Sequence, residues 1–185
     1  SYPSLPSSGL ATAVALDVNG DGRADLVGLP DNNSGGVLTL LALGPPASIT
    51  PASGTPQTAT VGTAFALPLK AKVVDVNNSP LPGVTVTFSA PQSGASAVLN
   101  PVTAITDSSG VATTNVTANT VAGAYAVSAT VSGVTAPAQF QLTNTPGPPA
   151  TIAPFSGNNQ TAVVNTPFAA PLVALIIDAY GNPVL

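Results

Sequence analysis

The chain has no histidine, cysteine, methionine or tryptophan, and only 5% of its 185 residues are charged. These absences exclude zinc sites built from cysteine and histidine, thiol nucleophiles and histidine-based catalytic triads. The acidic residues are seven aspartates, the basic ones are Arg23, Lys70 and Lys72, and the net charge is −4. Three cations cannot form the basic surface that nucleic-acid binding requires. The sequence therefore predicts neither an enzyme nor a nucleic-acid-binding protein.

Long hydrophobic runs are missing as well. No stretch approaches the roughly 20 apolar residues that cross a bilayer, so no membrane span is predicted. Hydrophobic residues nevertheless make up 44% of the chain, which is too many for a disordered protein. Serine, threonine, alanine and valine are abundant, with 20 prolines and 17 glycines between them. This composition favours short strands and tight turns over helices.

An internal repeat organises the chain. Residues 45–82 align without a gap with residues 148–185, at an offset of 103 residues and with 19 identities in 38 positions. A repeat of this length matches one β-sandwich domain. We therefore divide the chain into a head segment (1–44), a complete first repeat (45–147) and the opening of a second repeat (148–185). Prolines at the start of each repeat predict stiff connections.

Alternation of apolar and polar residues predicts strands in the first repeat. The apolar positions of four segments share one face: Phe65, Leu67, Leu69, Ala71, Val73; Val84, Val86, Phe88; Tyr125, Val127, Ala129, Val131; Phe140, Leu142. Lys70 and Lys72 fall on the opposite, solvated face of the first segment, and Asp75 and Asp107 are expected to cap turns. About seven strands are expected, in an all-β, Ig-like sandwich.

Three motifs in the first repeat resemble the bacterial Ig-like domains of the invasin and intimin type: VVDVNNSPLPGVTVTF, ITDSSGVATTNVTA and AGAYAVSATVSG. The resemblance covers roughly residues 47–143 and, through the repeat, 150–185. It implies an Ig-like sandwich in tandem array, in which the domains stack into rods that hold a binding tip away from the cell. The cysteine–tryptophan core of antibody domains is absent.

The head segment contains one motif with chemistry in it, DVNGDGRADL at residues 17–26. Its candidate ligands follow the alternating spacing of a calcium loop: Asp17, Asn19, Asp21, the Arg23 carbonyl and Asp25. Gly22 stands where such a loop turns sharply, and Gly28 stands where an EF-hand has its bidentate glutamate. The sequence therefore predicts a structural Ca²⁺ site outside the EF-hand family, with a metal-free Asx-rich turn as the alternative.

The head segment resembles the latter part of an FG-GAP or VCBS repeat, because Leu26–Leu29 after the loop is typical of a strand. In those repeats the loop binds calcium structurally. The resemblance implies a short β segment at the N-terminus that carries the calcium loop.

Together these patterns predict an extracellular protein of a bacterial cell surface, acting as a stalk, adhesin segment or filament subunit. Its expected partners are other copies of itself or adjacent Ig-like domains, and a host or surface ligand is not identified by the sequence. A carbohydrate- or protein-binding module, and an accessory region of a larger surface hydrolase, are the alternatives. The second repeat holds only the first strands of a sandwich, which either the continuing chain or another copy completes.

Overall fold

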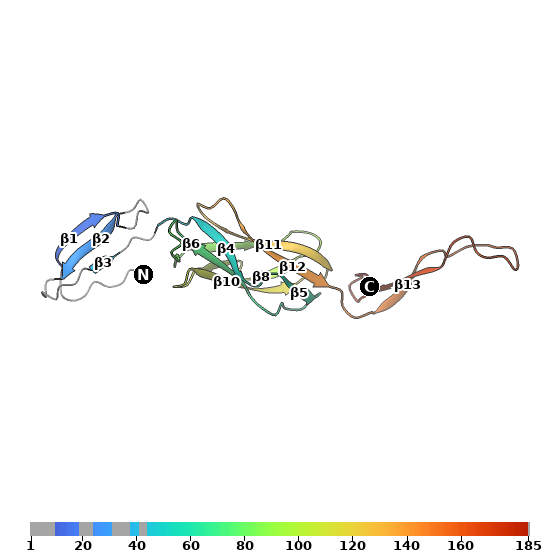
Figure 1. Ribbon diagram of the computed structural model, residues 1–185. Coiled ribbons are helices and arrows are strands. Elements are labelled where there is room, and N and C mark those ends of the chain that lie inside the picture. The colour runs from blue at the N-terminus through green and yellow to red at the C-terminus, as the bar shows by residue number, and fades with distance from the viewer. Residues whose placement is uncertain (1–9, 19–23, 31–37, 41–43, 185) are drawn as a thin grey trace.

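The computed structural model describes residues 10–18, 24–30, 38–40 and 44–184 (Figure 1). These residues form strands and turns without any helix, which confirms the all-β prediction. No described helix is therefore available to cross a membrane. In chain order the strands are β1 (Leu10–Leu16), β2 (Asp25–Pro30), β3 (Leu38–Leu40), β4 (Ser48–Ser53), β5 (Gln57–Thr60), β6 (Leu69–Val74), β7 (Thr85–Ser89), β8 (Ala97–Asn100), β9 (Thr103–Ile105), β10 (Val111–Ala118), β11 (Gly123–Val131), β12 (Ala138–Thr145), β13 (Thr151–Ser156) and β14 (Val173–Ile177).

The first repeat forms a sandwich of two sheets (Figure 1). One sheet has the order β4-β6-β10-β8 and the other the order β5-β12-β11-β7-β9. All neighbours are antiparallel except β5 and β12, which pair in parallel. Strands β1 to β3 form a separate three-stranded sheet, and β13 and β14 form a two-stranded one.

The core of the sandwich lies between the inner faces of its two sheets. Along β6, Leu69, Ala71 and Val73 are buried and the two lysines are exposed, as the alternation predicts. The largest fully buried side chains, Phe88 and Phe140, pack with their ring centroids 6.2 Å apart. Burial of such a ring stabilises the fold by roughly 1.5–3 kcal/mol. The hydrophobic effect thus fixes which face of each strand points inward.

The structure corrects two predictions. Leu67 was expected on the buried face, but it lies outside β6 and is exposed. The reason is that the Gln57 side chain forms hydrogen bonds with its backbone. Leu67 N donates to Gln57 Oε1 and Gln57 Nε2 donates to Leu67 O, each over 2.9 Å. The first repeat also has nine strands, β4 to β12, instead of about seven. Short strands were missed because three or four residues are too few to show an alternating pattern. These are β5, β8 and β9, with three or four residues each.

Gly54 allows the chain to cross from one sheet to the other between β4 and β5. Its φ is +89°, and a Cβ at this position would collide with the Pro68 carbonyl oxygen. Only glycine fits both the left-handed backbone and the close approach. The same holds for Gly157, 103 residues later, where φ is +81° and the Pro171 oxygen stands in the way.

The second repeat folds as the first one does, as far as it is described. Strands β13 and β14 pair in the register of β4 and β6, and the bulge falls at the same place. Gln160 Nε2 donates to Gly157 O and Ala170 O over 2.6 and 2.8 Å, as Gln57 does to Gly54 and Leu67. The internal repeat of the sequence is therefore also a repeat of backbone pairing and side-chain hydrogen bonds.

A buried polar network closes the end of the sandwich at which β12 finishes. The Asn144 amide, 1% exposed, donates to Ser96 O and Asn119 Oδ1 over 2.9 Å and to Val121 O over 3.1 Å. Tyr125 OH donates to Asn144 Oδ1 over 3.0 Å. Because both ends of the amide are satisfied, the network is stable in the interior and fixes the loop that contains residues 119–122.

Tyr125 packs against the core, as its place in the alternating segment predicts, and it also forms a hydrogen bond through its hydroxyl group. Its bond goes to a side chain and not to the backbone as in a tyrosine corner. Burial of the phenol raises the pKa of Tyr125 to about 12.

We expect Tyr125→Phe to destabilise the chain by about 1 kcal/mol, because Asn144 Oδ1 loses its donor. The raised pKa adds a pH dependence: stability is fully present below the ordinary pKa of 10 and is lost as pH rises through about 12. Urea unfolding across this pH range, with tyrosinate absorbance, measures both effects. Tyr180→Phe is the control and leaves the alkaline loss in place. An unchanged alkaline loss in Tyr125→Phe would contradict the assignment.

Candidate functional site

The described ends of the predicted calcium loop lie together. Strands β1 and β2 form an antiparallel hairpin in which Leu16 pairs with Asp25. Asp17 follows β1 and is exposed, whereas Asp25 begins β2 and is buried. Val18 N donates to Asp25 Oδ2 over 2.9 Å, which holds the two strand ends at the base of the loop.

The other three candidate ligands, Asn19, Asp21 and Arg23, lie outside the described residues. Among the residues that are described, no three acidic, histidine or cysteine side chains gather into a group that could hold a metal ion. The calcium loop therefore stays a prediction.

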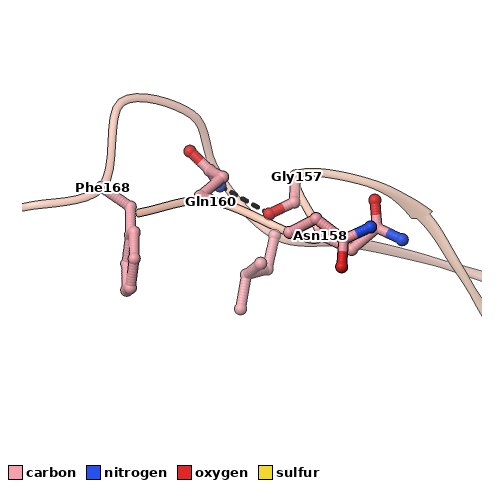
Figure 2. A pocket seen from close by; sticks show the side chains of 6 residues that line it. Gly157, Asn158, Gln160 and Phe168 are labelled. Carbon is pink, nitrogen blue, oxygen red and sulfur yellow. Dashed lines mark hydrogen bonds between the residues drawn. The ribbon is translucent and has the colours of Figure 1, made fainter. Parts of the chain in front are cut away.

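A pocket lies in the second repeat, between the turn after β13 and the start of β14 (Figure 2). It is lined by Gly157, Asn158, Asn159, Gln160, Phe168 and Leu172. Figure 2 shows the Gln160 amide reaching the Gly157 carbonyl, while the Phe168 ring projects away from the backbone.

The equivalent residues of the first repeat explain this pocket. Phe168 is 57% exposed and Leu172 is 77% exposed, but their counterparts Phe65 and Leu69 are 7% and 0% exposed beneath the sandwich. The lining offers apolar side chains and amides, and it holds no charged group. The pocket is therefore a part of a core face that stands uncovered, and its lining is not that of a catalytic site.

A polar site lies at the contact between the two repeats. The turn after β14 is capped by Asp178, whose Oδ1 accepts from Tyr180 N over 2.8 Å and from Asn182 N over 2.9 Å. Its other oxygen, Oδ2, accepts from Gly147 N in the connection and from Asn182 Nδ2, each over 2.9 Å. The Asn182 side chain then reaches the first repeat at residues 120–122.

Burial and hydrogen bonding have opposite effects on the pKa of the Asp178 carboxyl group. Burial disfavours its ionised form, but hydrogen bonds from the Asn182 side chain and from the amides of Gly147, Asn182 and Tyr180 outweigh this effect. Together they lower the pKa of Asp178 to about 2. The carboxylate is thus ionised at neutral pH and acts as a four-fold hydrogen-bond acceptor, which is a structural role and not an acid–base one.

Sequence reasoning predicted a part of this site. Asp75 was expected to cap a turn, and its Oδ1 accepts from Asn77 N and Ser79 N over 2.9 and 2.8 Å, which confirms it. Asp107 caps the turn at Ser109 in the same way. Asn182 was missed, although the alignment of the two repeats contained a signal, since serine stands at the equivalent position 79.

Comparison with solved structures places the fold. The chain is similar to FdeC, described as a broadly conserved Escherichia coli adhesin, with a TM-score of 0.51 and 18% identity over 87% of this chain and 52% of that one. It is similar to InvD of Yersinia pseudotuberculosis with a TM-score of 0.53 and 18% identity, over 87% of this chain and 51% of InvD. The D00–D0 domain of intimin matches at a TM-score of 0.43 and 21% identity, over 66% and 63%.

This chain spans about half the length of the FdeC and InvD chains that it matches. At these identities the likeness establishes a shared fold. No curated protein sequence matches the chain.

A family model adds the sequence-level match. The model of the bacterial Ig-like domain (group 1) matches residues 55–144. The match begins two residues before β5 and ends one residue before the end of β12. This agrees with the resemblance found in the motifs around Asp75, Asp107 and Tyr125. The sandwich of this chain is therefore an Ig-like domain that, over residues 55–144, matches the model of the bacterial Ig-like domain (group 1).

Proposed function

We propose that the chain is a segment of a stalk of tandem Ig-like domains on a bacterial cell surface, with a structural or adhesive role and no catalytic one. One observation carries the proposal: the second repeat reproduces the register and side-chain bonds of the first and is joined to it through buried polar contacts. When each copy contacts the next one through the same head-to-tail joint, the copies form an extended array, which is the geometry of a stalk.

The similar structures support the location and role. FdeC is described as an adhesin, and InvD of Yersinia pseudotuberculosis is another protein whose fold resembles this one. The sequence supports the same role, since the whole chain lacks histidine and cysteine and its sandwich has few charges. Such a surface suits a spacer that neither transforms a substrate nor binds polyanions.

The uncovered face of the second repeat supports the array. Ile152, Phe168 and Leu172 are exposed, whereas their counterparts Ile49, Phe65 and Leu69 are buried under strands of the same repeat. Strands like those of residues 84–145 would cover this face. They come either from the continuing chain or from another copy, and in the second case strand complementation builds a filament.

A carbohydrate-binding module is the less favoured function. Such modules recognise sugars with exposed aromatic side chains. In the sandwich, however, Phe65, Phe88 and Phe140 are buried, and Tyr125 is half-buried with its hydroxyl bonded to Asn144. No aromatic platform is therefore presented by the described residues of the first repeat.

We also propose that the loop at residues 17–25 binds a structural Ca²⁺ ion. Asp17, Asn19, Asp21 and Asp25 provide the hard oxygen ligands that Ca²⁺ prefers, and the paired ends of β1 and β2 support the loop. Charge neutralisation by the ion would relieve the repulsion between the aspartates and stiffen the head segment.

Small-angle X-ray scattering of residues 1–185 tests the stalk. A compact protein of this length has a radius of gyration of about 16 Å and an unfolded chain about 46 Å. We expect a value between the two, with a rod-like cross-section and a β-type circular dichroism spectrum. A compact particle contradicts the stalk. Growth into long filaments with rising concentration supports completion between copies, and short rods at every concentration contradict it.

Isothermal titration with CaCl₂ tests the loop. We expect saturable binding in the chain and none in Asp21→Ala, because the loop loses an oxygen ligand and a negative charge. Asp107→Ala, in an exposed turn of the sandwich, is the matched control and keeps the binding. At about 100 times the dissociation constant, Ca²⁺ should stabilise the head by about 2.7 kcal/mol. A chain that neither binds millimolar Ca²⁺ nor changes its melting with chelator contradicts the site.

A further inference from the structure

The end of the sandwich carries two backbone groups that are bonded by the next repeat. Ala122 N donates to Asn182 Oδ1 over 2.8 Å, and Asn182 Nδ2 donates to Thr120 O over 2.9 Å. One carboxamide thus satisfies a donor and an acceptor two residues apart, as a paired strand would. The residues that meet here are 60 and 62 positions apart in the sequence.

The receiving loop is held in place by its own repeat. Asn119 Oδ1 accepts from Val121 N over 3.1 Å and from Ser96 N over 3.2 Å, and Asn144 Nδ2 donates to Val121 O. Because these bonds are formed within the first repeat, the loop presents Thr120 O and Ala122 N without a further loss of conformational freedom. Preorganisation of this kind lowers the entropic cost of docking.

Burial shows that the first repeat covers the docked turn. Asn182 is 8% exposed, whereas Ser79 at the equivalent position of the first repeat is exposed. The backbone of Gly147 approaches closely, since a Cβ there would stand 3.5 Å from Asp178 Oδ2 and 3.8 Å from a methyl group of Val61. The connection, the end of the sandwich and the turn thus form one packed joint.

The corresponding turn of the first repeat lacks the group that makes this contact. Its aspartate, Asp75, is retained and folds the turn through the same Oδ1 bonds. Asn182, however, is replaced by Ser79, whose short hydroxyl does not span a carbonyl and an amide two residues apart. The turn preceded by an Ig-like repeat therefore has the carboxamide, and the turn preceded by the head segment does not.

We propose that the loop of residues 119–122 and Gly147 form a docking surface for the turn of a following Ig-like copy, and that Asn182 determines which copies dock. The partner is a second Ig-like repeat with an aspartate and, four residues later, an asparagine in the turn after its second long strand. Copies with serine at that position are joined without this contact. The inference rests on the proposed tandem stalk and adds the contact that sets the angle between neighbours.

Amide hydrogen exchange of residues 1–185, followed by NMR, tests the proposal in two variants, Asn182→Ser and Ser79→Asn, which swap the residue types of the two turns. In Asn182→Ser we expect the Ala122 amide to exchange roughly tenfold faster or more, while amides of the core, such as Ala129, keep their rates. Ser79→Asn is the matched control and leaves Ala122 protected. An Ala122 amide that exchanges equally fast in the unmodified chain and in Asn182→Ser overturns the proposal.

Titration of the Asp178 carboxyl in the same variants gives the second readout. Its pKa of about 2 should rise towards the ordinary value of 3.8 in Asn182→Ser and stay low in Ser79→Asn. The joint of the unmodified chain is then stable above pH 4 and opens as pH falls through about 2, because protonation removes the acceptor. A pKa that Asn182→Ser leaves unchanged contradicts the bond from Asn182 Nδ2 to Asp178 Oδ2, which holds the carboxamide in its docking position. A rod-like chain with an unprotected Ala122 would still leave the stalk function standing.

Discussion

The structure depends on one constraint: each strand of an Ig-like repeat has an apolar face that must be covered by a second sheet. In the first repeat, Leu69, Ala71 and Val73 of one sheet face Val127, Phe140 and Leu142 of the other, and all six are buried. Because this burial is the main source of free energy and almost no charges take part, the remaining features follow from it. These are the glycine that lets the first strand change sheets and the turns capped by aspartate.

Polar groups are concentrated where the sandwich ends and its apolar faces no longer provide contacts. Asn144 satisfies three backbone or side-chain acceptors and holds the loop to which Asn182 docks. Asp178 accepts four hydrogen bonds, one of which comes from the connection between the repeats. Apolar packing thus determines the fold of the sandwich, whereas directional hydrogen bonds join it to the turn of the second repeat.

The sequence predicted the fold well because period-two alternation and a gapless repeat report directly on burial and on domain length. Leu67 shows where such reasoning fails, since a glutamine ten residues away bonds its backbone and removes it from the strand. The joint was also missed, because its contacts connect Ala122 and Asn182 across 60 residues and no local pattern contains them. The calcium loop remains a prediction from spacing, as three of its five ligands lie outside the described residues.

The most direct test of the account joins residues 83–147 after Leu185, which supplies the second repeat with the strands that cover the first. Since the chain has no tryptophan, Phe168→Trp provides a single fluorescent probe of the uncovered face. We predict that the emission of this probe shifts to shorter wavelength in the extended chain, because the ring becomes buried as Phe65 is. An emission maximum that is the same with and without the added strands would contradict the account.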